Sequence, residues 1–342
     1  VSFGSELSRK YLPYSHVARV AHLNALDSQF YYKWTYLPGD SIPKKEVDYD
    51  HDPDDEENIE EEKEFDEEDG TLSIPKHEFD RLTDNLLLHK KLGRGSFGVV
   101  YEAYDLVLHK EVAAKQMNKK HLEELDAGPL DVHQELKALR KLPVHENICG
   151  FYRSFETVND VWLVLEKCGV VSLYDKAKSG QLSESDLKHY MREVVQAQIA
   201  LHKAGVYQLD IKLTNMMITK DNHIKLIDFG LAVLENTPLE YKVGADGYYT
   251  YEMGIMQTYL PSSVDAWGDG VCIFKALFGV TPFGDGSMTK FDRMVAKLEY
   301  SFPPDRPSPS EDLKDLLSRI FKPEGERISL EDMLAHPWIN NQ

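Results

Sequence analysis

Cysteine is scarce in this sequence of 342 residues, which contains only Cys149, Cys168 and Cys272. An odd number of cysteines without close spacing indicates neither a disulfide framework nor a zinc site. A reducing, intracellular compartment, cytoplasmic or nuclear, is therefore the simpler expectation. The chain begins with Val1 and lacks a basic segment followed by a short apolar stretch. A targeting signal further upstream, and with it a secreted effector, stays open as an alternative.

Long apolar runs and dense clusters of positive charge are also missing. No run approaches the roughly 20 apolar residues that a helix needs to cross a bilayer, so no membrane span is expected. The 39 lysines and arginines are outnumbered by 58 aspartates and glutamates, which gives a formal net charge of −19. Because nucleic acids and anionic membranes attract dense fields of Lys and Arg, neither is expected as a partner.

Carboxylates are concentrated between Glu46 and Asp69, where sixteen acidic residues stand beside a single basic one, Lys63. Such a segment contains too little apolar surface to offset the entropy that is lost on ordering. Residues 46–75 are therefore predicted to form an acidic disordered linker. An alternative is that the acidic segment folds over a basic groove of the same chain and competes with the molecules that bind there.

Residues 1–45 are rich in aromatic side chains. After Ser15, a candidate N-cap, apolar residues recur every three or four positions, as on one face of a helix: Val17, Val20, Leu23, Leu26 and Phe30. Pro38 and Gly39 then end the predicted helix. This aromatic helical extension is expected to pack on the domain that follows it, and the alternative is a separate arm that binds a partner.

From about Leu86 the pattern changes to short strand-like runs, and beyond Ser183 it changes to longer helical ones. The predicted strands are Leu86–Leu92, Val99–Asp105, Glu111–Met117 and Val161–Glu166. Ser183 followed by Asp186 predicts a helix start. Strands therefore precede helices along this part of the chain.

A glycine-rich motif follows the first of these strands, and residues 93–100 read GxGxxGxV. Glycines let a backbone turn sharply and approach phosphates without obstruction from a Cβ atom. The spacing alone is a weak signal, because dinucleotide sites use a similar one. Here the glycines lead into a second strand instead of a helix, which favours a hairpin over nucleotide phosphates.

More motifs follow in a fixed order. Lys115 ends a Val-Ala-Ala-Lys run and Glu135 lies in the next helical segment. The remaining motifs are GlyValTyrGlnLeuAspIleLysLeuThrAsn at 205–215, LysLeuIleAspPheGly at 225–230, a loop from Gly244 to Glu252, DxWxxG from Asp265 to Gly270, Arg327 and HisProTrp at 336–338. In this order they resemble the signature of the eukaryotic protein kinase superfamily, over about three quarters of the chain.

The resemblance implies an α+β, bilobal protein kinase fold over residues 84–340. Its N-lobe, residues 84–166, would be a small antiparallel β-sheet with one helix. Its C-lobe, residues 170–340, would be larger and mainly helical. Arg327 would be the buried partner of Glu252.

The resemblance also implies the roles of particular residues. Asp210 would accept the proton of a substrate hydroxyl, and Lys212 would stabilise charge on the transferred phosphoryl group. Lys115, paired with Glu135, would hold the α and β phosphates of ATP. Nucleotide contacts are implied for Leu92, Gly93, Gly95, Ser96, Phe97, Gly98, Val100, Ala113, Lys115, Glu166, Cys168 and Met217. Asn215 and Asp228 would ligate Mg²⁺, with Mn²⁺ as an alternative ion.

Some positions depart from the family pattern. Gln208 and Leu209 replace the His and Arg before the catalytic Asp, a non-RD pattern. In many kinases that Arg receives a phosphate of the activation loop, so Leu209 predicts that loop phosphorylation is unnecessary. Ala245 and Tyr251 also differ from the usual residues, which bears on substrate docking more than on ATP binding.

The expected activity is transfer of the γ-phosphoryl group of MgATP to serine or threonine hydroxyls of protein substrates. Serine and threonine are favoured by the resemblance because Lys212 stands two residues after Asp210. The alternative is a pseudokinase that binds ATP and acts as a scaffold or regulatory module.

Overall fold

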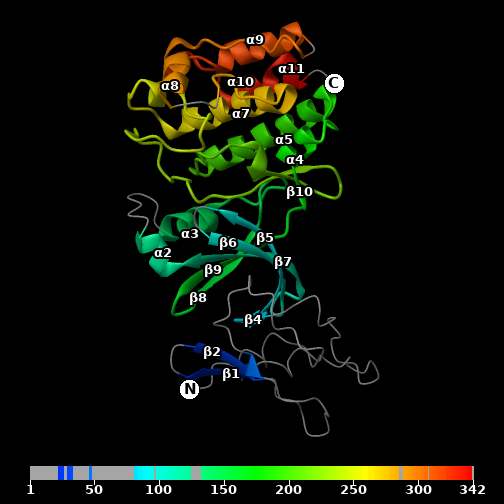
Figure 1. The fold of residues 1–342 in the computed structure, drawn as a ribbon, viewed down its shortest axis with the longest axis vertical. Coiled ribbons are helices and arrows are strands. Elements are labelled where there is room, and N and C mark those ends of the chain that lie inside the picture. Colours follow the sequence, from blue (N-terminus) through cyan, green and yellow to red (C-terminus); the bar gives the residue numbers. More distant parts are fainter. Residues whose placement is uncertain are drawn as a thin grey trace. The chain divides into compact units, whose positions relative to one another are not determined.

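The computed structural model describes residues 22–26, 29–33, 46–47, 81–95, 98–124, 132–284, 288–306 and 308–340. The chain divides into two compact units. Unit 1 comprises residues 1–126 and 152–167, and unit 2 comprises residues 127–151 and 168–342. Figure 1 labels the elements of both units along the chain.

Unit 1 is built on a six-stranded sheet with the order β4-β5-β6-β7-β9-β8. Its strands are β4 (Arg81–Thr83), β5 (Leu86–Gly95), β6 (Gly98–Asp105), β7 (Lys110–Asn118), β8 (Phe151–Glu156) and β9 (Asp160–Glu166), and the short helix α2 (Lys119–Glu124) follows β7. The neighbouring pairs from β4 to β9 are antiparallel. The four strands predicted from the apolar runs are confirmed as β5, β6, β7 and β9.

One face of this sheet forms the hydrophobic core of unit 1. Residues alternate between the two faces along each strand, and the buried ones gather on one face: Leu86, Leu88, Tyr101, Ala103, Val112, Ala114, Trp162 and Val164. Trp162 stacks on Phe155 with ring centroids 5.9 Å apart. The alternate residues of β6 and β7 project from the opposite face and are not part of this core.

Three short strands precede this sheet, and they correct the expectation of a helix. The strands β1 (His22–Leu26), β2 (Gln29–Lys33) and β3 (Glu46–Val47) form a separate antiparallel sheet. The helical spacing of Leu23, Leu26 and Phe30 is therefore misleading, because the aromatic run of β2 has a high strand propensity and β1 supplies an antiparallel partner. Ser15, Val17 and Val20 lie outside the described residues, as does the predicted acidic linker beyond Val47.

Unit 2 is mainly helical. Its helices are α3 (Val132–Lys141), α4 (Leu173–Lys178), α5 (Glu184–Lys203), α6 (Tyr251–Gly254), α7 (Pro261–Phe278), α8 (Met288–Lys297), α9 (Glu311–Ile320), α10 (Leu330–Ala335) and α11 (Pro337–Asn340), with the 3₁₀ turns η4 (Leu213–Asn215) and η5 (Glu324–Glu326). A small antiparallel sheet joins β10 (Val171–Ser172), β11 (Met216–Ile218) and β12 (Ile224–Leu226). The mixture of a β unit and a helical unit confirms the α+β class.

The two longest helices of unit 2 have recognisable signals at their ends, and the start of α5 was predicted. Ser183 caps α5 by accepting a bond from the Asp186 N–H at 3.0 Å, and the Asp186 carboxylate accepts one from the Ser183 N–H at 3.3 Å, as predicted. Pro261 opens α7, and Gly279 follows its last turn with φ +78°, a conformation that suits glycine. These ends place α5 and α7 against each other in the core, where Leu187, Val194, Trp267 and Val271 are buried, among others.

The helix α3 belongs to unit 2, whereas residues 84–166 were expected to form one lobe. The segment after α3 makes the contacts that explain this division. Ile148 bridges to Leu226, and the Cys149 N–H donates to the Leu226 carbonyl oxygen at 2.9 Å. Lys141 donates from Nζ to the Gly205 carbonyl oxygen at 3.2 Å. The segment from Lys141 to Cys149 is therefore tied to the helical unit.

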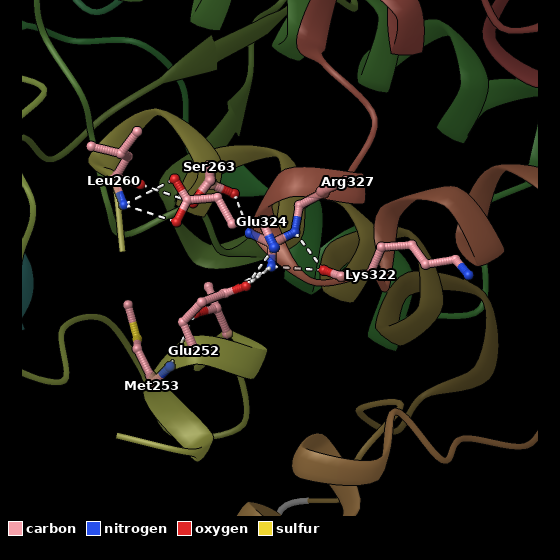
Figure 2. Close-up of polar contacts among 8 residues, drawn as sticks. Glu252, Met253, Leu260, Ser263, Lys322, Glu324 and Arg327 are labelled. Carbon is pink, nitrogen blue, oxygen red and sulfur yellow. Dashed lines mark hydrogen bonds and ion pairs between the residues drawn. The ribbon is translucent and has the colours of Figure 1, made fainter. Parts of the chain in front are cut away.

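A buried ion pair joins α6 to the segment around η5, and Figure 2 shows its contacts. The Arg327 Nη2 lies 2.9 Å and 3.1 Å from the two carboxylate oxygens of Glu252. The guanidinium also donates to the carbonyl oxygens of Ser263 and Lys322 at 2.8 Å and 2.9 Å. The predicted partnership of Glu252 and Arg327 is confirmed.

Within the described part of the chain, no helix combines the length and the apolar character needed to cross a membrane.

Candidate active site

The glycine-rich motif forms the turn between β5 and β6 in unit 1. Gly93 pairs with Val100, and Gly95 pairs with Gly98, so the predicted hairpin is present, while Ser96 and Phe97 lie outside the described residues. A Cβ atom on Gly98 would lie 2.0 Å from the Gln116 carbonyl oxygen. Glycine at this position is therefore required by the close approach of β7.

Gly93 and Gly95 differ from Gly98 because they lie in open space. A Cβ atom on either would meet nothing within 4 Å, and Leu92 beside them is 40% exposed. Packing within unit 1 does not explain these two glycines. Their lack of side chains leaves room for a ligand to approach the backbone.

Three of the predicted nucleotide-binding residues share the face of the sheet that is opposite to the core. Val100 is paired with Lys115 across β6 and β7, so both side chains project from the same face. Ala113 lies two residues before Lys115 and projects from that face as well. Lys115 is only 7% exposed, and burying an ammonium group is costly unless it has a polar partner.

The other predicted nucleotide contacts are divided between the units. Glu166 ends β9 in unit 1, whereas the half-buried Cys168 and Met217 belong to unit 2. Glu135 lies in the first turn of α3, is 4% exposed and also belongs to unit 2. Its pairing with Lys115 of unit 1 therefore stays a prediction.

Unit 2 brings two of the predicted catalytic residues, Asp210 and Lys212, and the predicted metal ligand Asn215 into one hydrogen-bonded cluster. The Asp210 Oδ2 accepts a bond from the Lys212 Nζ at 2.7 Å and another from the Asn215 Nδ2 at 3.0 Å. The same Asn215 nitrogen donates to the Asp210 carbonyl oxygen at 3.0 Å. Asp210 is 7% exposed, so its carboxylate is held in a fixed position beside a positive charge.

The surroundings of Asp210 shift its acidity. Burial raises the pKa of this carboxyl above its ordinary value, Lys212 opposes that effect through its charge and hydrogen bond, and the nearby Asp228 adds to the increase. The net pKa of Asp210 is raised. A carboxylate that binds a proton more readily than usual suits a group that has to accept one.

Asp265 of α7 holds the backbone before Asp210. Its two carboxylate oxygens accept bonds from the N–H groups of Gln208 and Leu209 at 3.2 Å and 2.9 Å, and one oxygen lies 2.8 Å from the His202 Nε2. Leu209 has φ +61°, which is uncommon for a residue other than glycine. The DxWxxG motif was recognised in the sequence, but this role of Asp265 was missed.

Gln208 joins the segment that contains Asp210 to the segment that contains Asp228. Its Nε2 donates to the carbonyl oxygens of Ile227 and Asp228 at 2.8 Å and 2.9 Å, and the Ile227 N–H donates to the Asn215 carbonyl oxygen at 2.9 Å. Asp228 itself has φ +64°. These bonds place Asp228 and Asn215 on segments that are tied to each other.

The oxygen donors of Asn215 and Asp228 fit a magnesium ion. Carboxylate and amide oxygens are the ligands that Mg²⁺ prefers. Asn215 uses its amide nitrogen in both bonds to Asp210, so the amide oxygen is consumed by neither. The charge of Asp228 raises the pKa of Asp210, so the two acidic groups lie in one region of unit 2.

Leu209 packs in an apolar cluster that includes residues of the loop before α6. Its side chain is 2% exposed and lies with Met253, Tyr259 and Val264. Partly buried residues pack against them, namely Tyr207, Val233, Leu239, Val243 and Tyr249. Leu209, which stands where the family pattern has an Arg, is thus part of a hydrophobic cluster.

Comparison with known proteins gives the family. The protein kinase domain model matches residues 86–339. The chain is 30% identical over 268 residues to maternal embryonic leucine zipper kinase of Xenopus tropicalis, covering 77% of this chain and 40% of that protein. It is 31% identical over 265 residues to calcium-dependent protein kinase 29 of Arabidopsis thaliana, covering 74% and 48%.

A third relative is CBL-interacting protein kinase 2 of Oryza sativa subsp. japonica, 28% identical over 279 residues, with 80% of this chain and 60% of that protein covered. The chain spans about half the length of the curated relatives it matches. With its motifs, its β unit and its helical unit, the chain belongs to the protein kinase family and has the bilobal α+β fold of that family.

Proposed function

We propose that this chain is an active protein kinase that transfers the γ-phosphoryl group of MgATP to serine or threonine hydroxyls of protein substrates. The observation that supports this most strongly is the buried cluster of Asp210, Lys212 and Asn215. Phosphoryl transfer needs positioned charges more than covalent chemistry from the protein. A cluster whose members are already held by hydrogen bonds meets that need.

In this proposal Asp210 orients the substrate hydroxyl and accepts its proton. Its raised pKa suits that role, because proton transfer is most effective when the pKa of the base lies nearer the working pH. Lys212, bound to Asp210 at 2.7 Å, stabilises negative charge on the transferred group. The preference for serine and threonine rests on the place of Lys212, two residues after Asp210.

We assign Mg²⁺ to Asn215 and Asp228 on the strength of their oxygen donors. When bound, the ion supplies positive charge that neutralises the phosphates. ATP is assigned to the glycine-rich turn and to the sheet face that carries Val100, Ala113 and Lys115. Leu92, Ser96, Phe97, Glu166, Cys168 and Met217 complete the proposed nucleotide contacts, and Glu135 is the proposed partner of Lys115.

The test is transfer of labelled γ-phosphate from MgATP to a mixed peptide library. The native chain is compared with Asp210→Asn, which keeps the shape of the side chain, and with Lys115→Met. Transfer by the native chain and loss in both variants would support an active kinase and identify the acceptor residue. Absence of transfer despite MgATP binding would overturn the proposal.

The competing function is a pseudokinase that binds ATP and acts as a scaffold. The substitutions Gln208, Leu209, Ala245 and Tyr251 favour it, because they depart from the family pattern around the catalytic residues. Gln208 nevertheless bonds the Ile227 and Asp228 carbonyl oxygens, which supports an ordered site. Nucleotide binding alone would not separate the two functions, whereas turnover would.

We also propose that the non-RD pattern removes the need for loop phosphorylation. The contacts of Leu209 with Met253 and Tyr259 supply apolar burial where a phosphate would otherwise bind an Arg. Thr237→Ala and Tyr241→Phe are then expected to leave the transfer rate nearly unchanged. Leu209→Ala is expected to cost about 2–5 kcal/mol of stability through the cavity left in the cluster.

The same kinetic assay, with unfolding by denaturant, measures both effects. A collapse of the rate to background in Thr237→Ala or Tyr241→Phe would contradict the idea. Thr250 is unsuited to this test because it is fully buried and its hydroxyl caps α6. Its replacement would change the stability of the fold as well as any phosphorylation.

The segments before the kinase domain are proposed to act as regulatory or partner-binding parts. Residues 1–45 would pack on the kinase domain or bind a partner, which a pull-down with the isolated segment tests. The acidic residues 46–69 would cover a basic substrate groove, and deleting them would then raise activity on a basic peptide. An unchanged rate would leave them as a linker only.

A further inference from the structure

Two histidines and a glutamate from α5 and from the turn between β11 and β12 come together in unit 2. His189 and Glu193 lie one turn apart on α5, and His223 lies in the turn between β11 and β12. One nitrogen or carboxylate oxygen from each lies within 4.8 Å of the others. Nothing in the proposed kinase activity uses these three residues.

The carboxylate of Glu193 is held so that one oxygen is directed at the histidines. Its Oε2 accepts bonds from the Ile224 N–H at 2.7 Å and from the Asn147 Nδ2 at 3.1 Å. Its Oε1 lies 2.6 Å from the His223 Nδ1 and 3.5 Å from the His189 Nε2. Outer hydrogen bonds of this kind orient a carboxylate before a metal ion binds.

A backbone oxygen completes the group of donors. The Asn222 carbonyl oxygen lies 3.2 Å from the His189 Nε2. The Asn222 side chain is fixed by a bond from the Tyr190 hydroxyl at 2.6 Å. Two nitrogens and two oxygens from α5 and the β11–β12 turn are therefore gathered in one place.

We propose that His189, Glu193 and His223 form a site for a divalent zinc ion, with the Asn222 carbonyl oxygen or a water as the fourth ligand. Two imidazoles and a carboxylate are a donor set that zinc uses in proteins. Zinc bonds to nitrogen and oxygen are about 2.0–2.2 Å long, so the ligand atoms of a tetrahedral site lie roughly 3.3 Å apart. The His189 Nε2 lies at nearly this distance from the Glu193 Oε1 and from the Asn222 carbonyl oxygen.

Binding requires only local changes. The zinc ion replaces the proton shared by the His223 Nδ1 and Glu193, which is released to solvent. The Nε2 proton that His189 donates to the Asn222 carbonyl oxygen is exchanged for a proton on Nδ1, so both histidines bind as neutral rings. The side chains of His189 and His223 are 43% and 54% exposed, so their rings can adjust and the ion can enter from solvent. The side chain of Glu193 is 11% exposed and stays in place.

The simpler explanation is a charge-assisted hydrogen bond between His223 and Glu193 with no metal. That explanation accounts for the 2.6 Å contact and for the bond between the His189 Nε2 and the Asn222 carbonyl oxygen. The two explanations differ in whether the chain binds zinc at this place. A bound zinc would link α5 to the β11–β12 turn. Because a ligand that binds only the folded state stabilises it, the midpoint of thermal unfolding should rise with the zinc concentration.

The test is titration of the metal-free full chain with Zn²⁺ in competition with a chromophoric chelator, in the absence of ATP. The double variant His189→Asn and His223→Asn removes both nitrogen ligands from exposed positions, so folding is expected to survive. His121→Asn, an exposed histidine on α2, is the matched control. Asp228→Asn removes a proposed magnesium ligand. It therefore distinguishes Zn²⁺ bound at the proposed magnesium site from Zn²⁺ bound by the two histidines.

The native chain, His121→Asn and Asp228→Asn should bind one more tight Zn²⁺ than the double variant, and the double variant should lose at least tenfold in affinity for that ion. Co²⁺ bound in the same position should give the visible absorption of a four-coordinate site. Equal zinc binding by the native chain and the double variant would overturn the proposal. The result is independent of kinase activity, because phosphoryl transfer is not measured.

Discussion

The buried pair of Glu252 and Arg327 allows a quantitative test of how unit 2 is held together. The side chains are 5% and 2% exposed, with the closest nitrogen and oxygen 2.9 Å apart. Glu252→Gln keeps the shape of the side chain and removes its charge, which leaves the Arg327 guanidinium buried without its counter-ion. Removing one partner of a buried pair costs about 3–5 kcal/mol, so we expect the free energy of unfolding to fall by that amount.

The control is Glu311→Gln, which breaks an exposed pair with Lys314 whose side chains are 88% and 37% exposed. Exposed pairs contribute about 0–1 kcal/mol, so this change should be nearly silent. Both variants are measured by denaturant unfolding near pH 7. The reasoning is refuted if Glu252→Gln costs no more than Glu311→Gln.

The pH dependence gives the same test a second readout. Burial raises the pKa of Glu252, but the charge and hydrogen bonds of Arg327 outweigh it, so the pKa lies below its ordinary value of 4.5. A lowered pKa means that the native state favours the ionised form, and this stability is present above the unfolded pKa. The advantage of the native chain over Glu252→Gln should therefore shrink as the pH falls below 4.5.

Two further predictions concern the proposed active site. Gly98→Ala should destabilise the fold by at least about 1–3 kcal/mol, because the new Cβ atom would collide with the Gln116 carbonyl oxygen. Gly93→Ala, where the new Cβ atom meets nothing within 4 Å, should leave the free energy of unfolding unchanged. Equal losses in denaturant unfolding would contradict this. Lys212→Ala removes a charge that lowers the pKa of Asp210, so the acidic limb of the profile of kcat/KM against pH should move to higher pH. Lys220→Ala, an exposed lysine, is the control, and an acidic limb that stays in place in Lys212→Ala would count against Asp210 as the base.

The main strands and the cluster of Asp210, Lys212 and Asn215 were predictable from the sequence because each depends on local signals. Asp210, Lys212 and Asn215 lie within six consecutive positions, so a short segment brings them together with little help from distant contacts. Ser183 and Asp186 likewise form a capping box within a single turn. Short-range chemistry of this kind can be read directly from residue types and spacing.

Other features depend on residues that are far apart in the chain. The spacing of Leu23, Leu26 and Phe30 fits a helix, but pairing between β1 and β2 decides the structure. Glu193 and His223 are thirty positions apart, and no spacing rule relates a helix to a later turn. The bond of Asp265 to the backbone of Gln208 spans a longer gap of 57 positions.

The contacts of Asp265 also matter for protein engineering. The segment that contains Asp210 takes its shape from a carboxylate on another helix, which holds the N–H groups of Gln208 and Leu209. A peptide with residues 208–215 alone lacks that support and would lose the left-handed backbone at Leu209. Transplanting residues 208–215 into another scaffold would therefore require a transplanted α7, or an acceptor that replaces Asp265 at the same position.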